Sequence, residues 1–487
     1  YCGRLLTDSE GLVEAIEQLC ALPLVASTLE TMIFPQRIAN YTPALLDGLL
    51  GAGDVCWVGE GRTGGEGRVS LHLRESIALT LDPIPARARD GRPAEENRGN
   101  EEGWNENRWN EKELWIAQQL AGGGAIFGSE LLAAAQQEFS DLTAADFADQ
   151  LWELAWEGIV TSDSLAALRS VISGRSSAQK TQRARPRSQR TRRASFASMR
   201  QAALASQDPR LAGRWSLVPR PANLRNFSTG IQTGGAQTRV AQTGIQPGGA
   251  QTGGPHPTGP GRSDTTLAEA ERISTSLGLL LDRYGVVSRG SAMAEGYPGG
   301  FAAAYEGLAQ LEAAGYCRRG HFVEGMSGAQ FATSEAVNAL RDDGEDEAVV
   351  VLSAVDPANP FGAALPWPES RDPGGAKPRR NAGALLAIYQ GKPAFYLERG
   401  GKTALTFDLA GEVNLSSNGD SPDEGNDEIR RQIATVLMET CRRGRSDDFV
   451  LDTVDGERST RSVWASALKL AGFSVTPRGL SYTRPAW

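Results

Sequence analysis

The chain has 487 residues, which is too many for one hydrophobic core, and roughly 150 residues per domain predicts about three domains. Its formal net charge of −9 argues against a uniformly cationic coat for nucleic acid but leaves room for a local basic groove. The five cysteines are scattered without a Cys-x-x-Cys pair, and only three histidines are present. These counts argue against a zinc site or a disulfide framework and predict a reducing cytoplasm.

Targeting segments are not recognisable. No run of about 18 apolar residues exists, so the sequence predicts no membrane span. The start, YCGRLLTDSE, has no charged segment followed by an apolar one, which predicts no secretory signal. The chain begins with Tyr1 rather than an initiator methionine, which favours a fragment of a longer protein.

Residues 1–86 predict three helices followed by two strands. SEGLVEAIEQLCAL has apolar residues at helical spacing, and Ser27 with Glu30 has the spacing of a capping box for the second helix. Pro43 stands at the first position of the third helix. VCWVGEGRTGGEGRVSLHL then predicts two strands joined by a glycine-rich loop that holds Arg62. This order is that of a winged helix.

The same order of elements recurs in residues 113–173 and in residues 262–345. In the later copy, TTLAEAERISTSLGLLLDRYG and YPGGFAAAYEGLAQLEAAG predict helices, and YCRRGHFVEG predicts a hairpin. This hairpin places Arg318 and Arg319 on a wing. We therefore predict tandem winged-helix modules.

Two long polar tracts separate these modules, at residues 87–112 and 174–261. Within the second, residues 175–200 carry many Lys and Arg and no acid, and the imperfect repeat GIQTGGAQT and GIQPGGAQT follows. Such compositions cannot bury enough apolar surface to offset chain entropy, so we predict disorder. An island at residues 212–220, AGRWSLVPR, is expected to dock through Trp215.

The C-terminal third changes its periodicity. Residues 346–415 contain several runs of four to eight apolar or alternating residues with turns between them, which predicts a small β-barrel or sandwich. Residues 416–487 predict a C-terminal α/β, winged-helix-like unit. The predicted fold class is therefore α+β, with tandem winged-helix modules followed by a small β-barrel and this final unit.

One short motif resembles the end of a phosphate-binding loop. Gly401, Lys402 and Thr403 fit it, but Tyr396 stands where the first glycine is needed, and the ALTFDL that follows is strand-like. We interpret Gly400 and Gly401 as a hairpin turn. We expect neither an ATPase motif nor a metal site, and no cofactor in this region.

Arginines on the predicted wings are the candidates for DNA contact, because guanidinium is permanently charged and matches phosphate oxygens. Winged helices commonly present a helix to the major groove and a wing to the backbone. Alternatively, these are ordinary solvated side chains, or the modules pack on protein. The tract 175–200 either binds any polyanion or serves as a solubilising linker. The candidate side chains are Arg62, Arg68, Arg289, Arg318, Arg319 and His321.

The segment SAVDPANPFGAALPWP, residues 353–368, holds further candidates. Phe361 and Trp367 are aromatic surfaces that suit stacking on an unpaired base. Asp356 is either a general base that activates water, or the cap of an Asx turn that holds the loop. Gln330 either hydrogen-bonds a base or bonds to backbone, and we favour the backbone.

Several of these stretches together resemble one family. GYCRRGHFVEGMSGAQFA, SAVDPANPFGAALPWP, AGRWSLVP, GFSVTPRGL and YTPALLDGLLGAGDVCWVGEG look like the C-terminal region of bacterial large helicase-related (Lhr) proteins. The resemblance runs from about residue 8 to residue 484, and the polar tracts at 87–113 and 221–261 depart from it.

The resemblance implies a DNA-repair superfamily 2 helicase or translocase that moves 3′-to-5′ on single-stranded or 3′-tailed DNA. It implies that the motor, with its ATP and Mg²⁺ site, lies N-terminal to this region. It also implies winged-helix modules with a β-barrel and homo-oligomer assembly.

The implied fold is similar to winged-helix, AlkZ-like DNA glycosylases. Those enzymes use a Gln-x-Gln or Gln-x-Asp motif, whereas Gln330, Phe331 and Ala332 lack the second polar residue, so no catalytic pair is carried over. Three readings remain. They are a DNA-binding and oligomerising region of a repair helicase, a glycosylase for uracil or an alkylated base, and a protein-interaction scaffold. Whether this region is itself an enzyme is left open.

Overall fold

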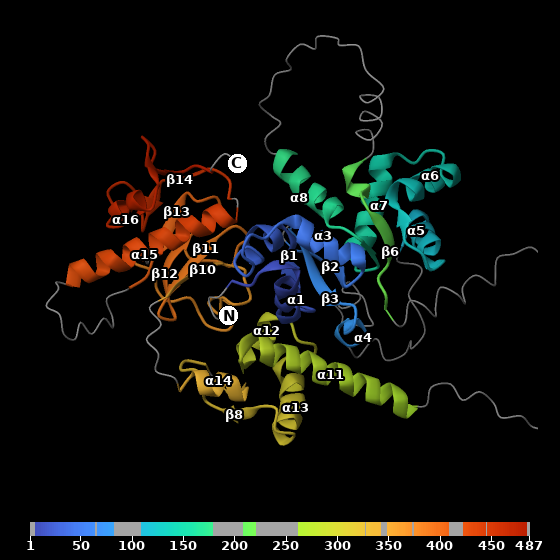
Figure 1. Cartoon of the computed structure of the whole chain (residues 1–487), viewed down its shortest axis with the longest axis horizontal. Helices are drawn as coiled ribbons and strands as arrows, with labels where there is room; N and C mark the ends of the chain where they lie inside the picture. Colours follow the sequence, from blue (N-terminus) through green and yellow to red (C-terminus); the bar gives the residue numbers. More distant parts are fainter. Residues whose placement is uncertain are drawn as a thin grey trace, which may run out of the picture.

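The computed structural model shows winged-helix modules, with the first of them in the middle, and a larger β-sheet at one side (Figure 1). The tracts predicted to be disordered lie outside the described part of the chain, except at 109–112, 174–178 and 208–220. No helix within the described part is both long and apolar enough to cross a membrane. The described residues are 5–63, 66–81, 109–178, 208–220, 262–326, 328–341, 348–372, 375–408, 422–444 and 446–484.

The first module is a winged helix in which β3 lies between β1 and β2, and both pairings are antiparallel. Pro43 begins α3 and Gly53, with φ of 81°, ends it in the left-handed conformation, as local sequence predicts. The predicted capping box is wrong, because Ser27 lies inside α2 and its hydroxyl donates to Glu66. The elements are α1 (Asp8–Gln18), β1 (Leu24–Val25), α2 (Ala26–Thr28), the π-helix η1 (Leu29–Ile33), α3 (Pro43–Ala52), β2 (Val55–Thr63), β3 (Glu66–Leu73) and α4 (Ile77–Thr80).

The second module has the same strand order, with β6 between β4 and β5. The expected island at 212–220 is thus more than a docked segment, because it supplies the central strand of this sheet. The connection between β5 and β6 occupies the place of the wing and includes the basic tract 175–200, whose residues after 178 are not described. The elements are α5 (Glu111–Ala121), β4 (Ile126–Phe127), α6 (Gly128–Glu138), α7 (Ala144–Trp156), β5 (Val160–Ser162), α8 (Ala166–Ala178), η5 (Pro209–Leu211) and β6 (Arg214–Leu217).

The first two modules share one hydrophobic core. Trp57 stacks on Trp152 with ring centroids 6.0 Å apart, and its indole N–H donates to the Ser162 carbonyl at 2.9 Å. A Cβ on Gly59 would lie 1.9 Å from the Ala155 carbonyl oxygen, so the close approach of β2 to α7 requires glycine. The two modules therefore form a single packed body.

The third module projects from the rest of the molecule, at the bottom of Figure 1, and has its own small core around Leu277, Leu308 and Phe331. Strand β9 lies between β7 and β8. Arg283 joins this module to the first, since its guanidinium donates to the Gln18 carbonyl at 2.8 Å. The elements are α11 (Arg262–Tyr284), β7 (Val286–Val287), α12 (Arg289–Ala294), α13 (Gly300–Ala313), β8 (Arg318–Gly320), β9 (Gln330–Ala332) and α14 (Ser334–Ala339).

The predicted small β-barrel is not found among the described residues. Its strands form an open six-stranded sheet whose edges are β10 and β16. Strand β15 of the C-terminal unit extends the sheet by pairing in parallel with β13. Helix α15 packs over this sheet (Figure 1). The elements are β10 (Val349–Ser353), β11 (Leu385–Tyr389), β12 (Lys392–Leu397), β13 (Thr403–Thr406), α15 (Pro422–Arg443), β15 (Thr453–Val454) and β16 (Glu457–Arg458).

The C-terminal unit repeats the winged-helix strand order, with β18 between β14 and β17. Helix α15 precedes this sheet as the first helix of a winged helix does, and the β15–β16 hairpin stands where the second helix would be. We predicted a boundary between a barrel and a final unit at residues 415 and 416. The strands on the two sides of this boundary instead belong to one sheet. The further elements are β14 (Phe449–Leu451), α16 (Ala465–Leu470), β17 (Ser474–Val475) and β18 (Leu480–Tyr482).

Candidate nucleic-acid interface

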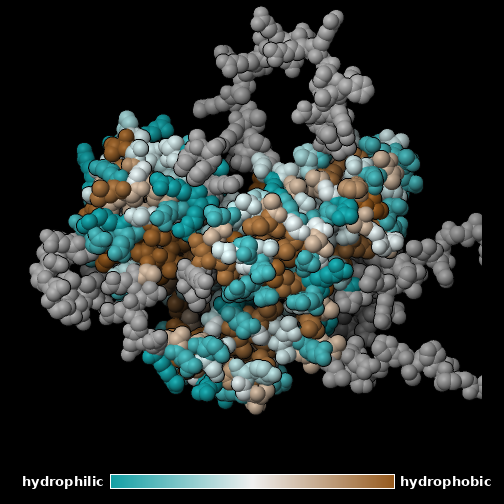
Figure 2. All heavy atoms as spheres, in the orientation of Figure 1, coloured by the Kyte–Doolittle hydropathy of each residue, from teal (hydrophilic) through white to brown (hydrophobic). Residues whose placement is uncertain are grey.

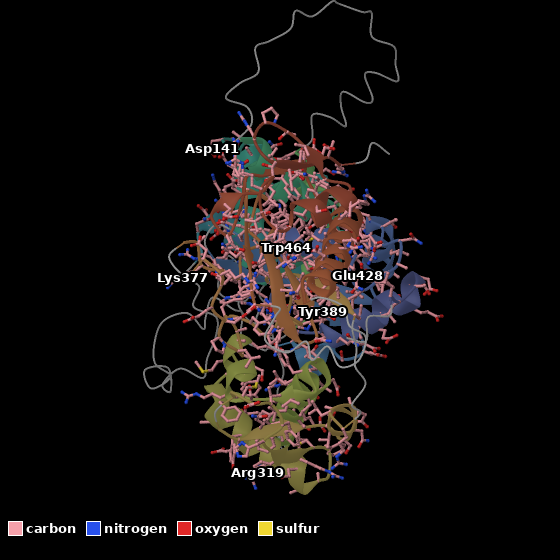
Figure 3. The ribbon with its side chains drawn as sticks, turned by 90° about the vertical axis from the view of Figure 1, so that its left-hand side faces the viewer. Asp141, Arg319, Lys377, Tyr389, Glu428 and Trp464 are labelled. Atoms are coloured by element: carbon pink, nitrogen blue, oxygen red, sulfur yellow. The ribbon has the colours of Figure 1, made fainter. Side chains whose placement is uncertain are left out.

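The wing of the third module presents exposed cations, as predicted. Arg318 and Arg319 lie on β8, and His321 follows directly. Figure 3 shows Arg319 at the far end of this module, away from the other modules. Its guanidinium lies 3.5 Å from the Glu312 carboxylate and 5.9 Å from the centre of the Tyr305 ring. Part of its charge is therefore balanced within the protein.

A buried glutamine shapes this wing from the inside. The Gln330 side-chain oxygen accepts the backbone N–H groups of Phe322 at 2.9 Å and Val323 at 2.8 Å. Its amide nitrogen donates to the carbonyls of Val323 at 3.0 Å and Met326 at 3.3 Å. The prediction that Gln330 bonds to backbone is confirmed. The turn after β8 is stabilised by these hydrogen bonds from the Gln330 side chain.

Arg289 is exposed at the start of α12, on the same module as these wing residues. The two arginines predicted on the first module's wing contact other parts of the protein, and their role in DNA binding stays a prediction. Arg62 lies 3.3 Å from Glu153 of the second module. Arg68 donates to the Pro23 carbonyl at 2.9 Å, and burial lowers the pKa of its guanidinium. The structure therefore does not bring the arginines of the two wings together.

Asp356 is fully buried in an ion pair. Its two carboxylate oxygens each accept a hydrogen bond from Arg37 at 2.8 Å, and one also accepts the Ala358 N–H at 2.9 Å. The contact with Ala358 is the Asx turn that was the alternative reading. Arg380 donates to the carbonyls of Asp356 at 3.0 Å and Asn359 at 2.6 Å. In this arrangement the carboxylate joins the first module to the sheet, and its role as a general base stays a prediction.

Phe361 and Trp367 pack against one another. Their rings stack with centroids 6.3 Å apart, and Trp367 meets Tyr396 edge-on at 5.7 Å. Phe361 is buried and Trp367 is partly exposed, in a small core beneath the loop. Both rings make contacts within the protein, and their stacking on a base stays a prediction.

The third helix of each of the first three modules carries acidic residues and no Lys or Arg. This is the helix that a winged helix commonly lays in the major groove. Carboxylates repel phosphates, so these helices are poorly suited to DNA. Asp47 is instead paired with Arg169 of α8 at 2.7 Å. The acidic residues are Asp47 on α3, Asp146, Asp149 and Glu153 on α7, and Glu306 and Glu312 on α13.

Sequence reasoning missed a basic groove beside the C-terminal unit. Its volume is about 720 Å³, and Lys402, Arg458 and Arg478 line it together with Asp448 and Asp452. A signal was present, because residues 458–484 contain basic residues and no acidic ones. The basic residues of that stretch are Arg458, Arg461, Lys469, Arg478 and Arg484.

Parts of the chain match models of a known protein family. Two models match, each described as a winged-helix domain of large helicase-related protein, for the third domain at residues 4–74 and the fourth at 266–350. These ranges cover the first and third modules. The Lhr helicase/probable uracil glycosylase of Mycolicibacterium smegmatis is 34% identical over 490 residues. The Lhr helicase/uracil glycosylase of Escherichia coli is 30% identical over 484 residues. The chain matches the C-terminal region of the large helicase-related (Lhr) family.

The predicted resemblance to Lhr proteins is thereby confirmed. Both alignments cover 97% of this chain, but only 27% and 26% of the two relatives. The chain thus spans about a quarter of the length of these relatives. Similarity to AlkZ-like glycosylases stays a prediction.

Proposed function

We propose that this chain is the DNA-binding region of a DNA-repair Lhr helicase or translocase whose motor lies elsewhere in a longer protein. Tandem winged-helix modules and relatives that are Lhr helicases support this proposal. ATP and Mg²⁺ would belong to the motor. The turn at Gly400 and Gly401 joins two antiparallel strands, β12 and β13, so these residues do not fit a phosphate loop.

The observation that carries the proposal is the exposed cationic wing of the third module. Arg318 and His321 have no ion pair among the described residues, and Gln330 holds the turn behind them. Guanidinium groups on a wing contact phosphates without reading bases. We therefore expect binding that depends on salt and little on sequence, with single-stranded or 3′-tailed DNA as the substrate.

Fluorescence anisotropy with labelled single-stranded DNA over a series of salt concentrations tests the proposal. We expect Arg318→Ala/Arg319→Ala to weaken binding and to reduce the salt slope by about 1.4, since each of two phosphates contributes roughly 0.7 on a single strand. Arg431→Ala/Arg443→Ala, on α15, removes the same formal charge as a control. A wild-type chain without affinity at low salt would refute the proposal and favour a protein-interaction scaffold.

We further propose that the chain forms homo-oligomers through its winged-helix modules. Large apolar side chains exposed on the third module support this, with Tyr316 71% and Met293 61% exposed. Figure 2 shows hydrophilic residues with hydrophobic ones between them on the visible face of this module. Native mass spectrometry of the chain tests this assembly, and a monomer at micromolar concentration would contradict it.

The second candidate function is a DNA glycosylase for uracil or an alkylated base, which the names of both relatives favour for uracil. Incubation with uracil- or alkyl-containing DNA, followed by alkali cleavage, measures base release. Asp356→Asn tests the predicted general base, and Arg37→Gln opens the same ion pair while keeping the carboxylate. An equal loss of base release in both variants would indicate that the Arg37–Asp356 ion pair has a structural role. A loss in Asp356→Asn alone supports catalysis, and no release by the wild type dismisses this function.

A further inference from the structure

We propose that the groove between the Gly400–Lys402 turn and the wing of the C-terminal unit binds one nucleic-acid strand through its phosphates. The cations that would contact them are Lys402, Arg458 and Arg478. The inference rests on the proposed DNA-binding function and assigns it a second site, separate from the wing of the third module.

The first cation is placed by a tight turn. Gly400 and Gly401 have φ of 83° and 71°, and a Cβ on Gly401 would lie 2.2 Å from the Phe449 ring. Only glycine therefore allows the turn to lie against β14. The Lys402 carbonyl accepts the backbone N–H of Asp452 at 2.8 Å, which ties the turn to the start of β15. The Lys402 side chain is exposed at this junction.

The other two cations come from β16 and from the turn between β17 and β18. Arg458, on β16, donates to the Pro477 carbonyl at 3.3 Å, so it reaches the turn between β17 and β18. In that turn the Thr476 N–H donates to the Gly479 carbonyl at 2.8 Å, and Arg478 is exposed at the tip. A Cβ on Gly479 would lie 2.1 Å from the Leu451 carbonyl oxygen. The wing is therefore fixed against β14, and Arg478 is held beside Arg458.

The three side chains keep their charge available. Within the described part of the chain, no carboxylate lies within ion-pair distance of Lys402, Arg458 or Arg478. Of the two carboxylates in the groove, Asp448 accepts the Arg484 N–H at 2.8 Å. Asp452 remains as a negative group at the floor. The lining therefore has a net positive charge, in a chain whose total is −9.

The small volume of the groove suits a single strand rather than a duplex. The groove has a volume of about 720 Å³, within the roughly 300–1,000 Å³ of sites that enclose a ligand. The hydroxyl groups of Thr453, Ser481 and Thr483 also line it and can donate to phosphate oxygens. The third helices of the other modules are acidic, whereas α16 carries Lys469 and no acid. The C-terminal unit is thus the winged-helix-like unit whose charge best fits a polyanion.

The test compares variants of the full chain for binding to a labelled oligothymidine across salt concentrations. Lys402→Gln/Arg458→Gln/Arg478→Gln should reduce the salt slope by about 2, because each of three phosphates contributes roughly 0.7 on a single strand. Binding should weaken at least tenfold at ~0.1 M salt. Lys377→Gln/Arg431→Gln/Arg443→Gln removes the same charge elsewhere and should retain the wild-type slope. Lys402→Arg/Arg458→Lys/Arg478→Lys keeps the charge and should restore binding.

The outcomes separate this inference from the proposed function. If the wild type does not bind DNA, the proposed function fails. If the wild type binds and the groove variant keeps its slope, only the groove is refuted. Equal losses in the groove and control variants show a general charge effect and also overturn it. Competition by thymidine monophosphate at the concentration of oligonucleotide phosphate would indicate a nucleotide pocket and overturn the assignment to a strand. Circular dichroism melting verifies that each variant is folded.

Discussion

Replacing Arg37 with methionine should destabilise the junction between the first module and the sheet. Arg37 and Asp356 are 4% and 0% exposed, and two hydrogen bonds of 2.8 Å join them. Arg37 also donates to the Ile33 carbonyl at 3.1 Å. Removing the guanidinium leaves a buried carboxylate without its counter-charge, which costs about 3–5 kcal/mol. Replacing both partners, as Arg37→Met/Asp356→Leu, removes the unpaired charge and should cost much less.

Hydrogen-exchange mass spectrometry measures this effect locally. The Ala358 amide donates to Asp356 and should exchange on the order of 10² to 10³ times faster in Arg37→Met, because each 1.4 kcal/mol is about tenfold. The matched control is Arg431→Met, which opens an exposed pair with Glu428 and should cost less than about 1 kcal/mol. If Arg37→Met changes exchange no more than this control, the buried pair does not hold the junction and the reasoning is refuted.

Three further predictions concern the core and its titratable groups. Gly59→Ala should lower the free energy of unfolding by about 1–3 kcal/mol, because the added Cβ would meet the Ala155 carbonyl. Urea unfolding measures this change, and an unchanged free energy of unfolding would contradict the prediction. Burial lowers the pKa of His72 from 6.5 to about 3. Between these two pH values the unfolded chain binds a proton that the folded chain does not. The free energy of unfolding therefore decreases as the pH is lowered through this range, by up to about 1.4 kcal/mol per pH unit. His72→Gln should flatten that slope in urea titrations from pH 7 to 4, and an unchanged slope counts against the assignment. Burial raises the pKa of Cys56 to about 11 and of Cys441 to about 12, so both thiols should resist iodoacetamide at pH 8 until the chain unfolds. Rapid labelling of either in the native protein would disprove this.

Local sequence was sufficient for some of the helices and for some individual side chains. Helical spacing and Pro43 located α3, and the positive φ of Gly53 ends it as its position predicts. The side chain of Gln330 bonds to backbone as favoured. These features depend on residues within a few positions of one another, so a sequence window contains the information that determines them.

Strand pairing between distant segments was not predictable in the same way. The segment around Trp215 is the central strand of the second module, and β15 extends a sheet predicted to be a closed barrel. The same alternation of apolar residues is compatible with a closed barrel and with an open sheet. The choice depends on which distant edge has free backbone groups and which apolar face remains to be covered.

The candidate sites show the same division. The sequence by itself determined which side chains carry charge, and it correctly placed Arg318 and Arg319 on an exposed wing. Only the tertiary structure decided that Asp356 faces Arg37, 319 positions away along the chain. It also decided that Lys402 and Arg478 line one groove. The reason is physical, because the effect of a charge depends on whether folding places it against a counter-charge or solvent.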